Sequence, residues 1–157
     1  MMSDYRELMD ALAVRIGIVG GRLKPDADGV CRIGTRDIRV AFMDLPERQA
    51  LLIHCAVCEL PVEGADAFKS ALLRENFMGR GAPGGAFSLS GDDVVYLHRY
   101  MPYATTDAAA FVRAVEEFMR IVMNWRRLAE AYGPVAEQRA QKREEERYLS
   151  LSGFMQV

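Results

Sequence analysis

An apolar stripe along residues 105–128 is the most regular pattern in the sequence. Large side chains recur there at spacings of four, three, four and three residues, which places them on one face of an α-helix. They are Phe111, Val115, Phe118, Val122 and Trp125. Just before them, the side-chain oxygens of Thr105, Thr106 and Asp107 can accept hydrogen bonds from the first free amides of a helix. The pattern predicts a long helix with one continuous apolar face.

A glycine-rich turn precedes this helix and limits how the chain reaches it. Four glycines around Pro83 end the helical pattern of residues 68–77. Residues 86–90 then alternate apolar and polar side chains, and a Gly-Asp-Asp turn separates them from the apolar segment 94–101. These features predict a helix, a sharp turn and a β-hairpin, in that order.

The first half of the chain predicts one helix and three strands. Ser3 or Asp4 can cap a helix whose apolar side chains follow helical spacing up to Ile16. Residues 30–33 and 37–43 flank a Gly-Thr-Arg turn and predict a hairpin, and the apolar run 49–60 predicts a buried strand. The full order, α-β-β-β-α-β-β-α, predicts an α+β fold with an antiparallel five-stranded sheet and three helices.

This order of elements resembles the class I type III secretion chaperones of the Tir-chaperone (CesT-like) family. The resemblance covers roughly residues 3–132 and includes the segment Leu72-Leu73-x-x-Asn76-Phe77 just ahead of the glycine turn. It is a pattern of elements and contains no catalytic signature. The resemblance implies a cytoplasmic homodimer that holds the N-terminal segment of a secreted effector in extended form and delivers it to the secretion ATPase of the export apparatus. It implies no cofactor and no enzymatic activity.

The resemblance also implies two sets of contact residues. The effector would lie on the first helix and first hairpin, with an edge strand for its backbone. The residues expected to bind the effector are Met9, Leu12, Val14, Ile18, Val30, Arg32, Ile38, Val40 and Phe42. The residues expected at the dimer interface are Phe68, Ala71, Leu72, Phe77, Phe87 and Leu89.

Size and charge exclude several classes of partner. The 157 residues carry a formal net charge of −2, which favours neither nucleic acid nor membrane binding. No apolar run reaches the roughly 18 to 20 residues of a membrane span, and the N-terminus lacks a basic start and a cleavage site. We expect a cytoplasmic protein with one domain over residues 1–132 and a charged extension over 133–157.

Two alternative functions are compatible with the sequence. The first is a regulatory or sensory domain of the same fold without a secretion client. The second is a thiol or metal enzyme built on Cys31, Cys55, Cys58 and His54. Because side chains alternate along a strand, Cys55 and Cys58 are expected to project to opposite faces and not to share an ion. We therefore expect structural cysteines and no metal site.

The end of the extension turns apolar again after a charged spacer. Six apolar side chains lie there, namely Tyr148, Leu149, Leu151, Phe154, Met155 and Val157. We expect this end to lie on apolar surface near the effector groove and to be displaced by the client.

Overall fold

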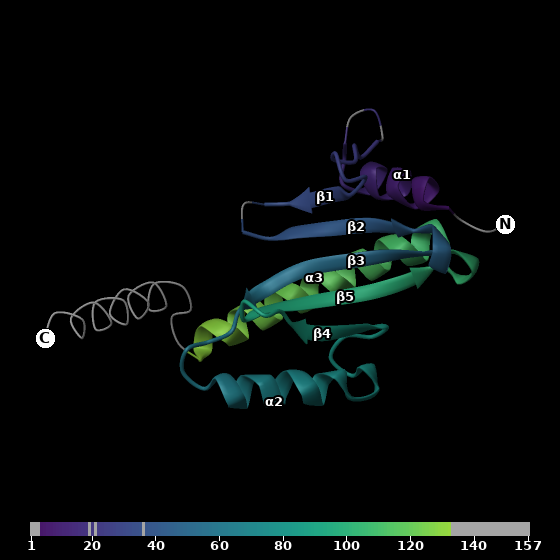
Figure 1. The fold of residues 1–157 in the computed structure, drawn as a ribbon. Coiled ribbons are helices and arrows are strands. Elements are labelled where there is room, and N and C mark those ends of the chain that lie inside the picture. Colours follow the sequence, from purple (N-terminus) through teal and green to yellow (C-terminus); the bar gives the residue numbers. More distant parts are fainter. Residues whose placement is uncertain (1–3, 19, 21, 36, 133–157) are drawn as a thin grey trace, which may run out of the picture.

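The computed structural model describes residues 4–132 except 19, 21 and 36, so the extension 133–157 lies outside the described residues. The elements follow the predicted order (Figure 1). They are α1 (Tyr5–Arg15), β1 (Cys31–Gly34), β2 (Arg39–Leu45), β3 (Ala50–Glu59), α2 (Ala65–Asn76), β4 (Gly85–Leu89), β5 (Val94–Pro102) and α3 (Ala108–Ala131), with short 3-10 turns at Pro46–Arg48, Phe77–Gly79 and Tyr103–Thr105. The predicted α+β fold is confirmed.

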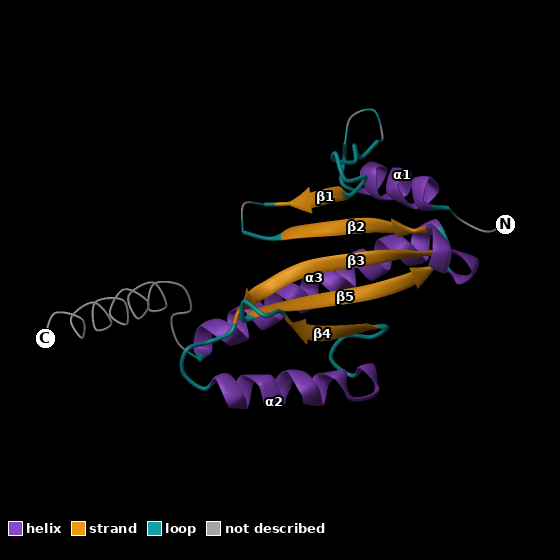
Figure 2. Ribbon diagram, in the orientation of Figure 1, coloured by secondary structure: helices purple, strands orange, loops and turns teal. Residues whose placement is uncertain are grey.

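The strands form one antiparallel sheet in the order β1-β2-β3-β5-β4. Figure 2 shows the sheet with α3 behind it, α1 beyond β1 at one end and α2 beside β4 at the other. The outer strands are therefore β1 and β4. Gly85 lets the start of β4 approach β5 closely, because a Cβ atom there would lie 2.6 Å from the carbonyl oxygen of His98.

Aspartates fix where the first and last helices begin. The backbone amide of Glu7 donates to Asp4 Oδ1 at 2.8 Å, and that of Ala110 donates to Asp107 Oδ1 at 2.7 Å. Of the predicted caps, Asp4 and Asp107 therefore make the capping bonds. The helix α1 ends at Arg15, so Ile16 is its C-terminal cap and is exposed, although the spacing predicts it on the buried stripe.

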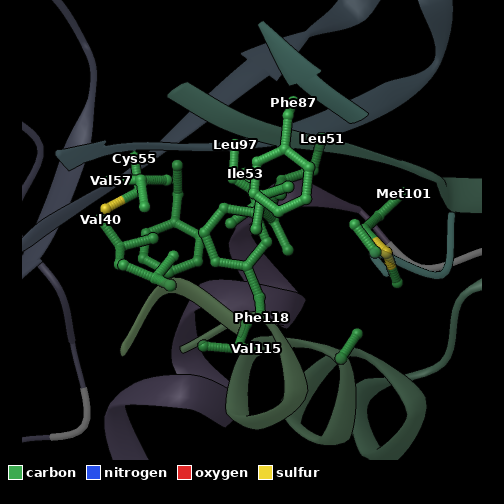
Figure 3. Close-up of a cluster of buried hydrophobic side chains, with 14 of the residues drawn as sticks. Val40, Leu51, Ile53, Cys55, Val57, Phe87, Leu97, Met101, Val115 and Phe118 are labelled. Carbon is green, nitrogen blue, oxygen red and sulfur yellow. The ribbon is translucent and has the colours of Figure 1, made fainter. Parts of the chain in front are cut away.

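The core lies between the sheet and the apolar face of α3. All five residues of the predicted stripe are buried, and α1 adds Leu8, Met9 and Leu12 on the same side. Figure 3 shows Val115 and Phe118 of α3 pointing toward Val40, Ile53 and Leu97 of the sheet. The Phe42 and Phe111 rings meet edge to face, with 6.0 Å between their centroids.

The opposite face of the sheet has no described helix in front of it (Figure 1). Because strand side chains alternate, this open face carries the neighbours of the buried residues. Its centre consists of Ala41, Met43, Leu52, His54, Tyr96, His98 and Tyr100, all partly or fully exposed.

Two histidines face each other at the centre of the open face. His54 on β3 and His98 on β5 are register partners. The His54 ring stacks on Tyr96 with centroids 4.7 Å apart, and His98 meets Tyr100 edge to face at 6.1 Å. Burial lowers the pKa of His54 below its usual 6.5, and the neighbouring His98 lowers it further.

We predict that this histidine pair makes the fold less stable in mild acid. Because the folded-state pKa of His54 is lowered, the unfolded chain binds the proton more readily, so stability is fully present above about pH 6.5 and falls as pH drops through the lowered pKa. Denaturant unfolding at several pH values should show a shallower loss for His54→Gln than for wild type.

His98→Gln provides the matched control, because it keeps His54 and removes one cause of its shift. An NMR titration should find the pKa of His54 closer to 6.5 in that variant. Identical pH dependence in wild type and His54→Gln would contradict the prediction.

Candidate functional site

Several apolar side chains that are not buried in the core lie beside α2 and β4. A groove of about 220 Å³ lies between these two elements and is mostly apolar. It is lined by Lys69, Leu72, Leu73, Asn76, Phe87, Ser88 and Leu89. We call this groove, together with the adjacent Phe77 and Met78, the α2–β4 surface.

The end of α2 holds the most exposed large apolar side chains of this surface. Leu73 is 70% exposed, Phe77 60% and Met78 84%. Met78 has a φ of 56°, which interrupts the helical path and turns the chain into the glycine-rich loop. The Arg80 guanidinium lies 5.9 Å from the centre of the Phe77 ring. Exposure of three neighbouring large apolar side chains is typical of a binding surface.

The floor of the groove is continuous with the core. Leu72 and Phe87 are buried, and the Phe87 ring lies 5.1 Å from the Trp125 ring, centroid to centroid. Phe68 is fully buried and packs edge to face on Trp125 and Tyr132. Phe68 therefore serves the core, and its predicted place in a dimer interface is wrong for this structure. The reason is that α2 has apolar side chains on two sides, and spacing alone does not tell which side faces inward.

The remaining residues predicted for the dimer interface lie on or near the α2–β4 surface. Phe77 and Leu89 are exposed, Ala71 is half-buried, and Leu72 and Phe87 form the groove floor. Sequence reasoning missed Leu73 and Met78. A signal existed for both, because each is a large apolar residue beside a predicted one.

A second exposed apolar group lies at the end of α1. Val14 is 71% exposed, Ile16 is exposed and Ile18 is half-buried. Arg15 forms an exposed ion pair of 2.6 Å with Glu116 of α3. On the first hairpin, Arg32 is exposed and pairs with Asp26, and Ile38 is half-buried. Of the predicted effector-binding residues, Val14, Ile18, Arg32 and Ile38 are accessible.

The other predicted effector-binding residues belong to the protein's own core. They are Met9, Leu12, Val30, Val40 and Phe42, all buried. Their prediction as a binding surface is corrected by this burial. Period-two alternation places Val40 and Phe42 on one face of β2, but only the packing of α1 and α3 decides that this face is the covered one.

The cysteines are arranged for packing. Cys31 and Cys55 are buried and Cys58 is half-buried, and all three are free thiols. A β-bulge between Ala56 and Cys58 shifts the register, so that Cys58 lies opposite Val95 and packs against the same core as Cys55. The expectation that the two cysteines project to opposite faces is therefore wrong.

The chemistry of Cys55 disfavours a thiol enzyme. Burial raises the pKa of Cys55 to about 11, against a smaller opposing effect of Arg126, so the thiol is protonated at neutral pH.

Within the described ranges, no group of three His, Cys, Asp or Glu side chains is placed to hold a metal ion. No described helix is long and apolar enough to cross a membrane.

Comparison with solved structures identifies the fold. A chain of the ExsC–ExsE complex superimposes with a TM-score of 0.64 at 22% sequence identity, covering 78% of this chain and 90% of that one. The Yersinia pestis type III secretion chaperone SycH in complex with a fragment of YscM2 gives 0.62 at 14% identity, with 78% and 99% covered. The HopA1–SchA chaperone–effector complex gives 0.61 at 13% identity, with 76% and 91% covered.

Comparison with curated protein sequences gives no match. A family model does match, and it spans residues 7–126, which include most of α1, the whole sheet, α2 and most of α3. This chain therefore belongs to the Tir chaperone protein (CesT) family.

Proposed function

We propose that this protein is a cytoplasmic chaperone that binds the N-terminal segment of a type III secretion effector and delivers it to the export apparatus. The observation that carries the proposal is exposed apolar surface on a member of this family whose own core is already filled. Support comes from the solved structures of the same fold, which include SycH with a fragment of YscM2 and the HopA1–SchA chaperone–effector complex. A chaperone needs no catalytic group, and none is assigned here.

The α2–β4 surface is proposed as the interface of a homodimer. The exposed Leu73 lines a groove that is large enough to receive an apolar side chain, and the exposed Phe77 and Met78 directly follow Asn76 at its margin in the chain. In a two-fold dimer the same patch serves both copies, so a protruding side chain and a groove on one patch are mutually complementary. The charged side chains near the groove are few, as expected for the centre of such an interface.

The effector is proposed to bind at the other end of the sheet. Val14 and Ile18 offer apolar contacts at the end of α1, and β1 is an outer strand that can pair with an extended backbone. Because the two surfaces are separate, the dimer could persist both while the effector is bound and after it is released. Delivery to the secretion ATPase is carried over from the family resemblance and is a further expectation.

We predict that the α2–β4 surface controls self-association. Light scattering of wild type should give about twice the monomer mass of 17.6 kDa. Phe77→Asp places a charge in the apolar centre and should yield a monomer, because an unpaired buried charge is strongly unfavourable. Leu128→Asp, at an exposed apolar site on α3 that does not line the groove, provides the control and should stay a dimer.

We predict that Val14 takes part in effector binding. In a pull-down from the native bacterium followed by mass spectrometry, wild type should capture a secreted protein through its N-terminal segment. Val14→Asp should reduce affinity for that segment about tenfold, which is roughly 1.4 kcal/mol, without changing the unfolding transition. If Val14→Asp captured the secreted protein as well as wild type does, the end of α1 would not be part of the effector-binding surface.

A further inference from the structure

One side chain of α2 is bonded to the backbone of the outermost strand. The Asn76 side-chain amide donates from Nδ2 to the carbonyl oxygen of Phe87 at 2.9 Å, and the Phe87 backbone amide donates to Asn76 Oδ1 at 2.7 Å. Asn76 therefore uses both backbone groups of one β4 residue, as a neighbouring strand would. Asn76 is the last residue of α2, which lies alongside β4 (Figure 1).

These bonds close the outer side of β4. In an antiparallel pair, the two backbone groups of a residue point to the same side and alternate along the strand. Because Phe87 bonds Asn76, its backbone points away from β5, and so do those of Gly85 and Leu89. The amide of Gly85 donates to the carbonyl of Ala82 at 2.8 Å. The start and middle of this edge are thus occupied by the protein's own groups.

The other outer strand differs. Val30, directly ahead of β1, is bonded to Asp26 through both of its backbone groups. Within β1, apart from the pairing with β2, the backbone of Arg32 and Ile33 makes no hydrogen bond to another described part of the chain. An unoccupied strand edge can pair with an extended segment of another chain, whereas an occupied one cannot. The two ends of the sheet are therefore unequal as acceptors of a strand.

We propose that Asn76 determines which edge of the sheet an extended partner segment can join, because it occupies the outward backbone groups of Phe87 in the middle of β4 and leaves β1 as the accepting edge. The inference rests on the proposed function in that the partner binds in extended form. It also means that two copies meeting at the α2–β4 surface pack through side chains and do not join their sheets. Asn76 is thus a positioning residue for partner recognition.

A purely structural role for Asn76 makes a different prediction. If the side chain only tethers α2, its loss lowers stability and leaves the mode of association unchanged. If it closes the edge, its loss exposes two backbone groups that a second copy can pair with. The experiments below use the full chain without a client, so their outcome does not depend on whether the proposed effector exists.

Hydrogen exchange on the wild type gives the first test. The amides of Phe87 and Leu89 both point outward from the edge strand, and only that of Phe87 has Asn76 as acceptor. The Phe87 amide should exchange at least about tenfold more slowly than that of Leu89. Equal exchange at the two positions would overturn the proposal, and this measurement needs no variant that could fail to fold.

Substitution gives the second test. Asn76→Ala should speed exchange of the Phe87 amide at low protein concentration. At high concentration it should produce assemblies larger than wild type, in which that amide is protected again by strand pairing. Asn76→Asp keeps an acceptor for the amide and adds an edge charge that opposes strand pairing, so it should form no assembly larger than wild type at any concentration. Asn124→Ala, at an exposed asparagine of α3, provides the control. An Asn76→Ala protein with wild-type mass at every concentration would overturn the proposal.

Discussion

The packing of α3 against one face of the sheet is the interaction on which the rest of the structure depends. The helix spans the sheet, and its buried residues meet side chains from β2, β3, β5 and β4. Polar contacts fix its position: Arg126 donates to the carbonyl of Val57 at 2.9 Å, and Arg99 pairs with Glu117 at 2.9 Å. Burial of about ten large apolar side chains at roughly 1.5–3 kcal/mol each is the main stabilising contribution.

Because α3 and α1 cover only one face, the molecule is left with unequal surfaces. The opposite face keeps a half-buried centre of histidine and tyrosine rings, and α2 lies beyond the sheet edge, where one side of it has no described element to pack on. Binding in this protein therefore depends on what the core leaves uncovered. The apolar groups of the α2–β4 surface and the end of α1 lie at opposite ends of the sheet, which permits two partners at once (Figure 1).

Edge protection connects the fold to its proposed function. A sheet with two open ends would join other sheets without limit, which is a hazard for any protein that presents a strand edge to a partner. Here the β4 end is covered by α2 and closed at Phe87 by Asn76, whereas β1 is short and pairs, among the strands that the structure describes, with β2 alone. A protein arranged in this way can accept one extended segment and still remain a finite particle.

The sequence by itself determined the elements, their order and the family, because helix and strand periodicity, capping aspartates and glycine turns are local properties of the chain. It did not determine which apolar side chains are buried. Val40 and Phe42 were expected on a binding surface and lie in the core, and Phe68 was expected at an interface and packs on Trp125. The sequence pattern also did not predict the β-bulge that brings Cys58 to the same side of the sheet as Cys55. Periodicity groups side chains into faces, but only the packing of distant elements decides which face is covered, and that choice separates core from binding surface.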